Sequence, residues 1–264
     1  MQLLYSKFVI ITTKNTIEMK LNGTYKIQLF LVFASFLFNG CDEFFNCIDG
    51  NGILKQERRF VSEFYGVENT TSIDVDISSD SVYSLEVTAD ENLLGMIQTT
   101  VRNGNLVISM STDRCINTDN YMLIEIQMPT IDHIESTGSG NMDIYDFECG
   151  NLEITNSGSG KIDMINVYSG ETVGLNLYGS GSIYIGGKAR VGEYVLSGSG
   201  DIMADDLMVD DCYVTNSGSG TVYCFAYDYL KATLSGSGDI IYSGNPPVTD
   251  FTDSGSGEIR SRTN

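Results

Sequence analysis

The sequence predicts an all-β protein, a right-handed parallel β-helix (solenoid) of about seven repeats of roughly 20 residues. Three observations predict this fold class. The triplet Gly-Ser-Gly recurs at nearly constant spacing, apolar and polar residues alternate on both sides of it, and only three prolines interrupt the chain. A fixed period near 20 residues is typical of a solenoid, and parallel crossovers favour the right-handed form.

Each repeat combines one triplet with two inward-facing positions. Alternation of this kind is what a strand with one buried face requires. The triplets end at Gly140, Gly160, Gly181, Gly200, Gly220, Gly238 and Gly257. Two places later stand Met142, Ile162, Ile183, Ile202, Val222, Ile240 and Ile259. Four places before the first glycine stand Ile134, Ile154, Leu175, Tyr194, Val214, Ala232 and Phe251, which predict a second buried ladder.

The triplet glycines have two interpretations, and both predict a corner between strands. Glycine adopts backbone angles that other residues reach only at a cost, and stacked corners without side chains do not collide. An antiparallel meander is the main alternative fold. Propeller blades need about 40 residues each, and calcium-binding β-rolls repeat every nine residues, so neither fits this period. A phosphate-binding loop is excluded because a strand, not a helix, follows each triplet.

The segment before the repeats, residues 58–131, is predicted to be a β-rich cap, and residues 132–262 form the β-helix. Asn103-Gly104 between two alternating runs predicts a hairpin turn. Asp90 is positioned to start a short helix over Glu91 to Leu94. A solenoid needs such a cap because its first rung would otherwise present open strand edges.

The N-terminus predicts export and lipid attachment. Residues 27–38 (IQLFLVFASFLF) form an uncharged run that is too short to span a bilayer but suits a signal peptide. Gly40-Cys41 follows it and resembles the lipobox of bacterial lipoproteins, which makes Cys41 the predicted lipid attachment site. Residues 1–40 are then the signal peptide, with 1–18 as an overlong start before Met19, and residues 41–57 are the lipidated tether. An ordinary signal peptide followed by an unmodified cysteine is the alternative.

The remaining cysteines and the charge limit the chemistry. Five cysteines other than Cys41 cannot all pair; a Cys47–Cys115 bridge is conceivable, and buried free thiols are the default expectation. The sequence predicts no metal site and no cofactor, because it has no C-x-x-C pair or Cys/His cluster and His133 is the only histidine. Alternation points His133 outward, which also argues against a catalytic triad. The net charge of −20 argues against nucleic acid as a partner.

Several motifs together resemble one known family. VTADENLLGMIQTTVRNGNLVISM (residues 87–110), the SGSGDI units and SGSGDIIYSGNPPVTDFTDSGSGEIR (residues 235–260) are similar to the putative auto-transporter adhesin head GIN domain family. The resemblance covers about residues 58–262. It implies a β-helical domain on exported, lipid-anchored proteins of Gram-negative bacteria, with adhesion as the suggested role and no established catalytic residues.

The residues offer little support for catalysis, so we expect a non-enzyme. A β-helix polysaccharide lyase or hydrolase, the alternative, would use paired carboxylates with a basic residue. Adjacent aspartates in an acidic protein are mostly solvated turn residues. The acidic candidates are Asp205, Asp206, Asp210 and Asp211, and the basic ones include Lys161, Lys188, Arg190 and Lys231.

The function predicted from the sequence is a non-catalytic surface adhesion or binding module of the cell envelope. Its partners would be the membrane, through the lipid anchor, and a glycan or protein ligand; a purely structural envelope protein remains an alternative. Asp42 and Glu43 after Cys41 resemble export signals, which predicts an outer-membrane lipoprotein displayed at the surface. Tyr184, Tyr223 and Tyr242 suggest a binding stripe, although a plain outer sheet face is the simpler explanation for them.

Overall fold

The computed structural model describes residues 47–262. The chain divides into two compact units, residues 1–47 and 48–264, and every element below belongs to the second. The predicted signal peptide, the start at Met19 and the lipid attachment site Cys41 lie outside the described residues. Within the described range, no helix is long and apolar enough to cross a membrane.

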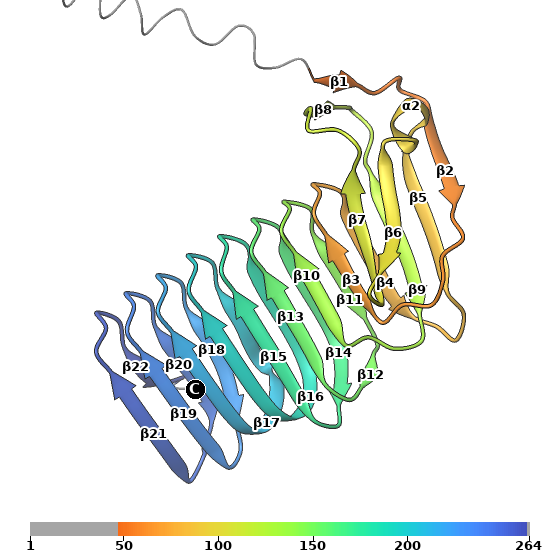
Figure 1. The fold of residues 1–264 in the computed structure, drawn as a ribbon. Helices are drawn as coiled ribbons and strands as arrows, with labels where there is room; N and C mark the ends of the chain where they lie inside the picture. Colours follow the sequence, from red (N-terminus) through yellow and green to blue (C-terminus); the bar gives the residue numbers. More distant parts are fainter. Residues whose placement is uncertain (1–46, 263–264) are drawn as a thin grey trace, which may run out of the picture. The chain divides into compact units, whose positions relative to one another are not determined.

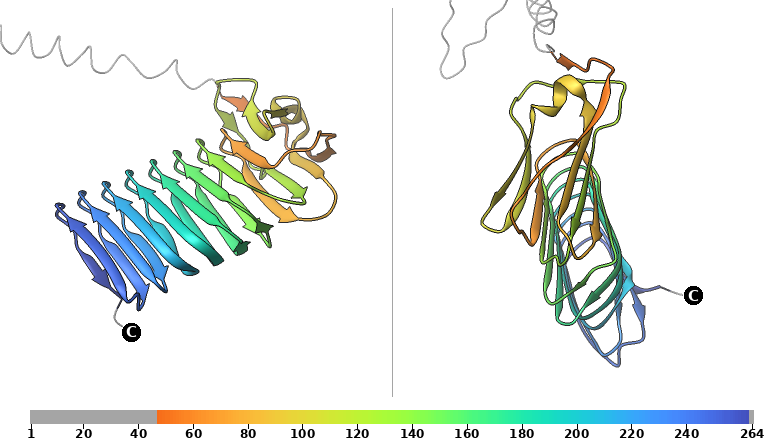
Figure 2. Two further views of the ribbon diagram at one scale, coloured as in Figure 1. Left: turned by 60° about the horizontal axis from the view of Figure 1, so that its bottom comes forward. Right: turned by 90° about the vertical axis from the view of Figure 1, so that its right-hand side faces the viewer.

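The second unit is a parallel β-solenoid, so the predicted all-β parallel β-helix is confirmed (Figure 1). Strands before the triplets form one face, which we call the pre-triplet face, and strands after the triplets form the post-triplet face. Stacking along both faces is parallel, which excludes the antiparallel meander. Successive rungs stack side by side in the other views as well (Figure 2).

The strands are assigned to the two faces by their pairing. The pre-triplet face holds, in spatial order, β7 (Asn105–Met110), β3 (Gly66–Asn69), β10 (His133–Ser136), β13 (Leu152–Asn156), β15 (Thr172–Leu177), the later parts of β16 (Ser182–Leu196) and β17 (Ile202–Asn216), β19 (Tyr229–Leu234) and β21 (Val248–Asp253). The post-triplet face holds β9 (Leu123–Met128), β4 (Asp74–Ser79), β11 (Met142–Tyr145), β14 (Lys161–Ser169), the earlier parts of β16 and β17, β18 (Val222–Ala226), β20 (Ile240–Gly244) and β22 (Ile259–Ser261). The short β12 (Glu148–Cys149) pairs with the end of β14.

The core lies between the two faces, and the two predicted inward ladders line it. Ile134 pairs in register with Ile154, and Met142 pairs with Ile162; all four are buried. The ladders stay buried until the last described rung, where Phe251 is 41% exposed and Ile259 is half-buried. Burial of each rung therefore depends on the next rung stacking on it.

The triplet glycines allow corner stacking. The interpretation that they supply unusual backbone angles is wrong, because none of them has a positive φ. A Cβ added to Gly158 would lie 1.9 Å from the Gly138 carbonyl oxygen, and one added to Gly179 would lie 2.0 Å from the Gly158 oxygen. Such distances are impossible for real atoms, so each corner accepts the next only without side chains at these positions.

Buried asparagines brace several of these corners. Asn216 accepts a hydrogen bond from the Gly218 amide (3.0 Å) and donates one to the Gly220 carbonyl (2.9 Å). Asn156 makes the same pair of bonds to its own triplet, and Asn69 braces the equivalent corner, which lacks a triplet. Each asparagine thereby satisfies backbone groups that the turn would leave without partners.

Chain order and spatial order differ at the N-terminal end. The rung of β3 and β4 lies between the β10–β11 rung and the β7–β9 rung, although β7 and β9 come later in the chain than β4. The predicted boundary at residue 131 stays a prediction, but β3 and β4 on its N-terminal side already continue the ladder.

Antiparallel strands cover the open edges of the first rung. β6 (Ile97–Arg102) pairs with β7, and β5 (Ser84–Asp90) pairs with β9. β2 (Leu54–Arg58) then pairs with β5, while β1 (Ile48–Asp49) pairs with β8 (Ile116–Asn117) in a separate small sheet. This arrangement protects backbone groups that could otherwise recruit another strand.

The predicted hairpin turn and short helix are confirmed, whereas the predicted capping role of Asp90 is wrong. The β6–β7 hairpin turns at Asn103 and Gly104, with φ of 51° and 85°. Helix α2 (Glu91–Leu94) begins after Asp90, but the Asp90 carboxylate does not cap it; it accepts hydrogen bonds from Thr118 and Asn120 instead. The default expectation of free thiols holds for Cys149, Cys212 and Cys224, whereas Cys47 and Cys115 are disulfide-bonded.

Candidate functional site

A row of carboxylates crosses the post-triplet face. Five neighbouring strands, β5, β9, β4, β11 and β14, each place one outward acidic residue at the same level. Register pairs join each of these residues to the next across the sheet. We call this set the acidic row; its members in spatial order are Glu86, Glu125, Asp76, Asp143 and Asp163.

The acidic row carries an electrostatic cost. Like charges directly opposite each other on adjacent strands destabilise a sheet. Partial burial raises the pKa of Asp76, and the nearby Asp143, Glu125 and Asp74 carboxylates raise it further. Burial also raises the pKa of Asp143, with the Asp163 carboxylate adding to the effect. A negatively charged row therefore favours a ligand that brings positive charge or hydrogen-bond donors.

A surface hollow of about 360 Å³ lies over one end of the acidic row. Asp76, Glu86, Glu125 and Tyr145 contribute to its wall. Gln56 of β2 donates hydrogen bonds to Glu86 (2.8 Å) and Glu125 (3.3 Å), so the cap holds two of the carboxylates in place. The hollow thus combines carboxylate acceptors with one aromatic ring.

Beyond Asp163 the same row becomes aromatic and apolar. Asp163 pairs with Tyr184, followed by Met203 and Tyr223. The Tyr184 hydroxyl donates to Asp206 (2.7 Å); this hydrogen bond, together with burial, raises the pKa of Tyr184 to about 12. Tyr184 and Tyr223 therefore lie on one face, as their repeat position predicts.

Tyr242 lies on β20 of the same post-triplet face, but its side chain does not point to the outer side of that sheet. It pairs with the buried Cys224, packs against the core and lies 5.6 Å from the Phe251 ring, centroid to centroid. The expectation of an exposed Tyr242 is wrong because this tyrosine occupies an inward position of the alternation. Its partial exposure arises at the end of the described solenoid.

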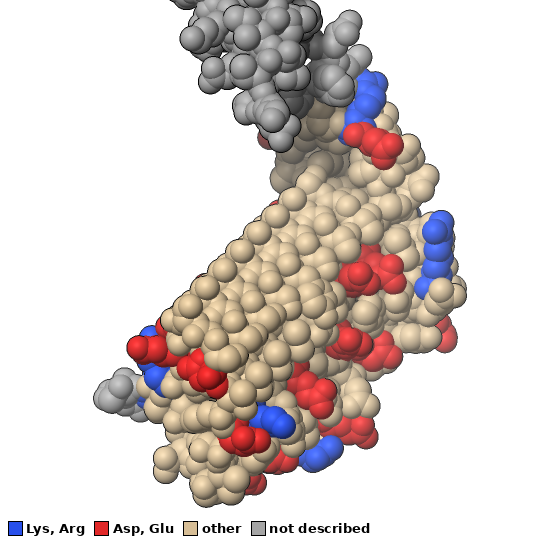
Figure 3. Space-filling model, turned by 60° about the vertical axis from the view of Figure 1, so that its left-hand side comes forward, with Lys and Arg blue, Asp and Glu red and all other residues tan. Residues whose placement is uncertain are grey.

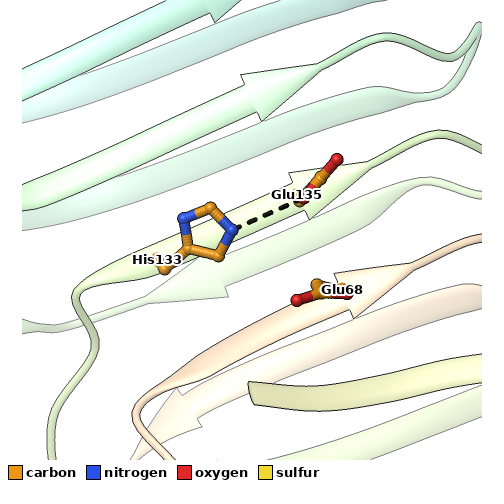
Figure 4. Close-up of side chains that lie close together, drawn as sticks. All are labelled: Glu68, His133 and Glu135. Atoms are coloured by element: carbon orange, nitrogen blue, oxygen red, sulfur yellow. Dashed lines mark ion pairs between the residues drawn. The ribbon is translucent and has the colours of Figure 1, made fainter. Parts of the chain in front are cut away.

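A second cluster lies on the pre-triplet face. Glu68 of β3 and both His133 and Glu135 of β10 place their ligand atoms within 4.8 Å of one another (Figure 4). The His133 Nε2 atom is 3.6 Å from a Glu135 carboxylate oxygen. His133 is half-buried and faces outward between the buried Ile131 and Ile134.

The triplet corners form a third surface. Figure 3 shows a broad area without Lys, Arg, Asp or Glu along the solenoid, with acidic residues beside it. The triplet serines are exposed along the corner. Beside them, the hydroxyls of Ser197 and Ser217, which each stand directly before a triplet, are 3.2 Å apart. This surface offers hydroxyl groups at regular intervals but no charge.

Four of the eight residues considered for catalysis are engaged in other contacts. Asp205 pairs with Arg262, and Asp206 accepts from Tyr184. Lys161 pairs with Asp163, and Lys231 lies 3.8 Å from Asp250. Asp210, Lys188 and Arg190 are exposed, and Asp211 lies half-buried on β17 opposite Val191. The structure therefore gives no positive sign of an acid–base pair at these residues.

Sequence reasoning did not predict the acidic row, although the repeat contains a signal for two of its members. Asp143 and Asp163 stand three places after their triplets, at the position also held by Tyr184, so the repeat relates them. Asp76, Glu86 and Glu125 come before the first triplet, so no repeat position relates them to one another. The bracing asparagines were also missed, although the repeated string TNSGSG at residues 155–160 and 215–220 is a signal for them.

The geometry agrees with the family that the chain matches. Residues 63–246 match the family described as "Putative auto-transporter adhesin, head GIN domain", so the chain belongs to this family. The match spans the β3 rung, the antiparallel strands β5 and β6 and most of the triplet rungs. No curated protein matches the chain.

Three solved structures share the fold. A putative adhesin from Bacteroides fragilis has a TM-score of 0.75 at 23% identity, covering 81% of this chain and 100% of that one. A putative lipid binding protein from Parabacteroides distasonis has a TM-score of 0.66 at 24% identity, with coverages of 83% and 100%. A putative adhesin from Parabacteroides merdae has a TM-score of 0.63 at 19% identity, covering 82% of this chain and 99% of that one.

Proposed function

We propose that this protein is a non-catalytic adhesion module of the cell surface that binds a glycan or protein through its post-triplet face. The observation that carries the proposal is the continuous outward row in which five carboxylates lead into Tyr184 and Tyr223. A rigid sheet keeps these groups at fixed spacing, so a repetitive ligand could contact several rungs together. The family's described role in adhesion supports this proposal.

The chemistry of the row limits the ligand. Carboxylates accept hydrogen bonds from sugar hydroxyls, amines and basic side chains, and tyrosine rings pack against sugar rings or apolar side chains. Anionic polymers, nucleic acid among them, are disfavoured by a net charge of −20. The ligand we propose is therefore a neutral or amino-bearing glycan, or a basic segment of a protein.

We propose further that a lipid on Cys41 anchors the module to the outer membrane and displays it at the surface. The support is the sequence alone: an apolar run at residues 27–38 followed by Gly40-Cys41. A Cys41→Ser variant expressed in a Gram-negative host should lose incorporation of labelled palmitate and leave the membrane fraction. Retention of label in the variant would contradict the anchor.

The binding proposal is tested with purified protein against a panel of polysaccharides and matrix proteins, scored for both retention and turnover. The double variant Glu125→Gln, Asp143→Asn should weaken binding. Its matched control is Glu193→Gln, which removes one exposed carboxylate from the opposite face. Saturable binding that the double variant reduces and the control preserves supports the proposal.

Two outcomes would overturn it. Release of new reducing ends or unsaturated products would establish the polysaccharide-active alternative and direct attention to Asp205, Asp206, Asp210 and Asp211. Equal binding by wild type and the double variant would place the ligand on another surface, of which the uncharged triplet corner is the next candidate.

A further inference from the structure

We propose that Glu68, His133 and Glu135 form a binding site for a divalent transition metal of the zinc class. This site lies on the pre-triplet face, opposite the surface proposed for adhesion, and is independent of that proposal. One imidazole and two carboxylates from adjacent strands supply three ligands, a number typical of zinc sites that keep a fourth position open.

The spacing of the three side chains fits such an ion. Ligands at zinc bond lengths of about 2.0–2.1 Å in a tetrahedron lie roughly 3.3 Å apart. The His133 Nε2 atom and a Glu135 oxygen are 3.6 Å apart, and all three ligand atoms fall within 4.8 Å. Both glutamate side chains are long and partly exposed, so small rotations about their side-chain bonds close the remaining gap.

The backbone fixes the positions of the ligands. Glu68 and Glu135 are in register on β3 and β10, and His133 is two residues before Glu135 on the same outward side. Gly66 is the register partner of His133, and a Cβ added there would lie 3.0 Å from the His133 Cβ and 2.3 Å from the Asn105 side-chain oxygen. The absence of a side chain at Gly66 leaves room between these groups.

Asn105 of β7 orients one of the ligands. Its side-chain amide donates a 2.7 Å hydrogen bond to Glu68 Oε1, which leaves the other carboxylate oxygen for the metal. Outer partners of this kind hold metal ligands in place, and their loss typically lowers metal affinity by about 10- to 100-fold. Imidazole combined with carboxylate favours zinc, copper or nickel over the hard cations calcium and magnesium.

The competing interpretation is a simple ion pair. A protonated His133 next to Glu135 would form an exposed pair that contributes little to stability. The two interpretations differ in what zinc does to the imidazole nitrogen. Because His133 is the only histidine in the chain, its side-chain nitrogen signals report on this site alone.

The experiment titrates zinc chloride into EDTA-treated, desalted protein, following the heat of binding and the ¹⁵N signals of the His133 imidazole. We expect one zinc bound at this site, with a shift of the Nε2 signal. Asn105→Ala should weaken this binding about 10- to 100-fold, and Glu68→Gln and Glu135→Gln, which each alter a direct ligand, should weaken it more. Glu153→Gln, next to His133 on β13 but outside the cluster, is the matched control and should bind like wild type.

Reading the wild-type imidazole signal keeps the test valid if a variant fails to fold, and separates this site from zinc bound by free thiols. Unchanged His133 signals at saturating zinc would overturn the proposal. Unchanged zinc affinity in folded Glu68→Gln and Glu135→Gln proteins would overturn it as well.

Discussion

Replacing one triplet glycine by alanine should cost about 3 kcal/mol of unfolding free energy. At Gly179 the new Cβ would lie 2.0 Å from the Gly158 carbonyl oxygen and 2.7 Å from the Ser157 carbonyl carbon and oxygen. All of these are backbone atoms, so no flexible side chain can move away. The Gly158 oxygen also accepts 3.1 Å hydrogen bonds from the Ser180 and Gly181 amides.

Relief of this clash requires the two rungs to separate at the corner. Each weakened hydrogen bond contributes about 1 kcal/mol, and overpacking of a rigid site adds about 1–3 kcal/mol. The matched control is Gly170→Ala, whose Cβ meets no atom within 4 Å. This control should change stability by less than about 1 kcal/mol, in the stabilising direction, because alanine restricts the unfolded chain.

The assay is guanidinium unfolding followed by circular dichroism, comparing Gly179→Ala, Gly170→Ala and wild type. A large fall in the midpoint for Gly179→Ala alone supports corner stacking as the reason for the triplets. If Gly179→Ala unfolds at the wild-type midpoint, or Gly170→Ala falls equally, the reasoning from the clash is refuted.

Two further predictions concern single side chains. Asn216→Ala should lower the free energy of unfolding by about 1–3 kcal/mol, because it leaves backbone groups of a buried corner without partners. Asn216→Leu should lower it less, because Leu196 and Leu234 occupy the same position in the adjacent rungs. Urea unfolding of both variants checks this, and an equal loss would contradict it. Asp143→Asn should stabilise the protein at neutral pH but not below the ordinary carboxyl pKa, because the raised pKa of Asp143 means that its ionisation disfavours the folded state as pH rises. Thermal unfolding at pH 3.5 and pH 7 measures the difference, and an equal effect at both pH values would contradict it.

The repeating part of the fold could be predicted because each rung repeats its own chemistry. Tyr194 illustrates what the repeat can and cannot predict. Its repeat position predicts an inward side chain, and this side chain is buried. The space for its ring comes from Gly192, where a Cβ would lie 2.5 Å from the Tyr194 hydroxyl oxygen. Periodicity predicts direction, but such compensation between neighbouring residues becomes visible only once the chain is folded.

The rung of β3 and β4 escaped prediction because it lacks a triplet. A Cβ added to a triplet glycine would clash with the rung on its N-terminal side. At Gly138, for example, it would lie 1.8 Å from the Thr71 carbonyl oxygen. The next rung in that direction, β7 and β9, joins its strands through residues 111–122 instead of a tight corner. Thr71 therefore has no stacked corner to avoid, and no glycine is required in its place.

The insertion of the cap strands between β4 and β10 determines which site residues could be predicted to be neighbours from the sequence. Asp143 and Asp163 are 20 residues apart, one repeat, and their adjacency follows from the period. Glu68 and Glu135 are 67 residues apart, and so are Asp76 and Asp143, because the cap strands are inserted between β4 and β10. Alternation predicts that these side chains face outward, but not which strands are neighbours. Both candidate sites contain residues from strands on either side of this insertion. The sites therefore depend on the pairing of β3 with β10 and of β4 with β11, which the repeat alone does not predict.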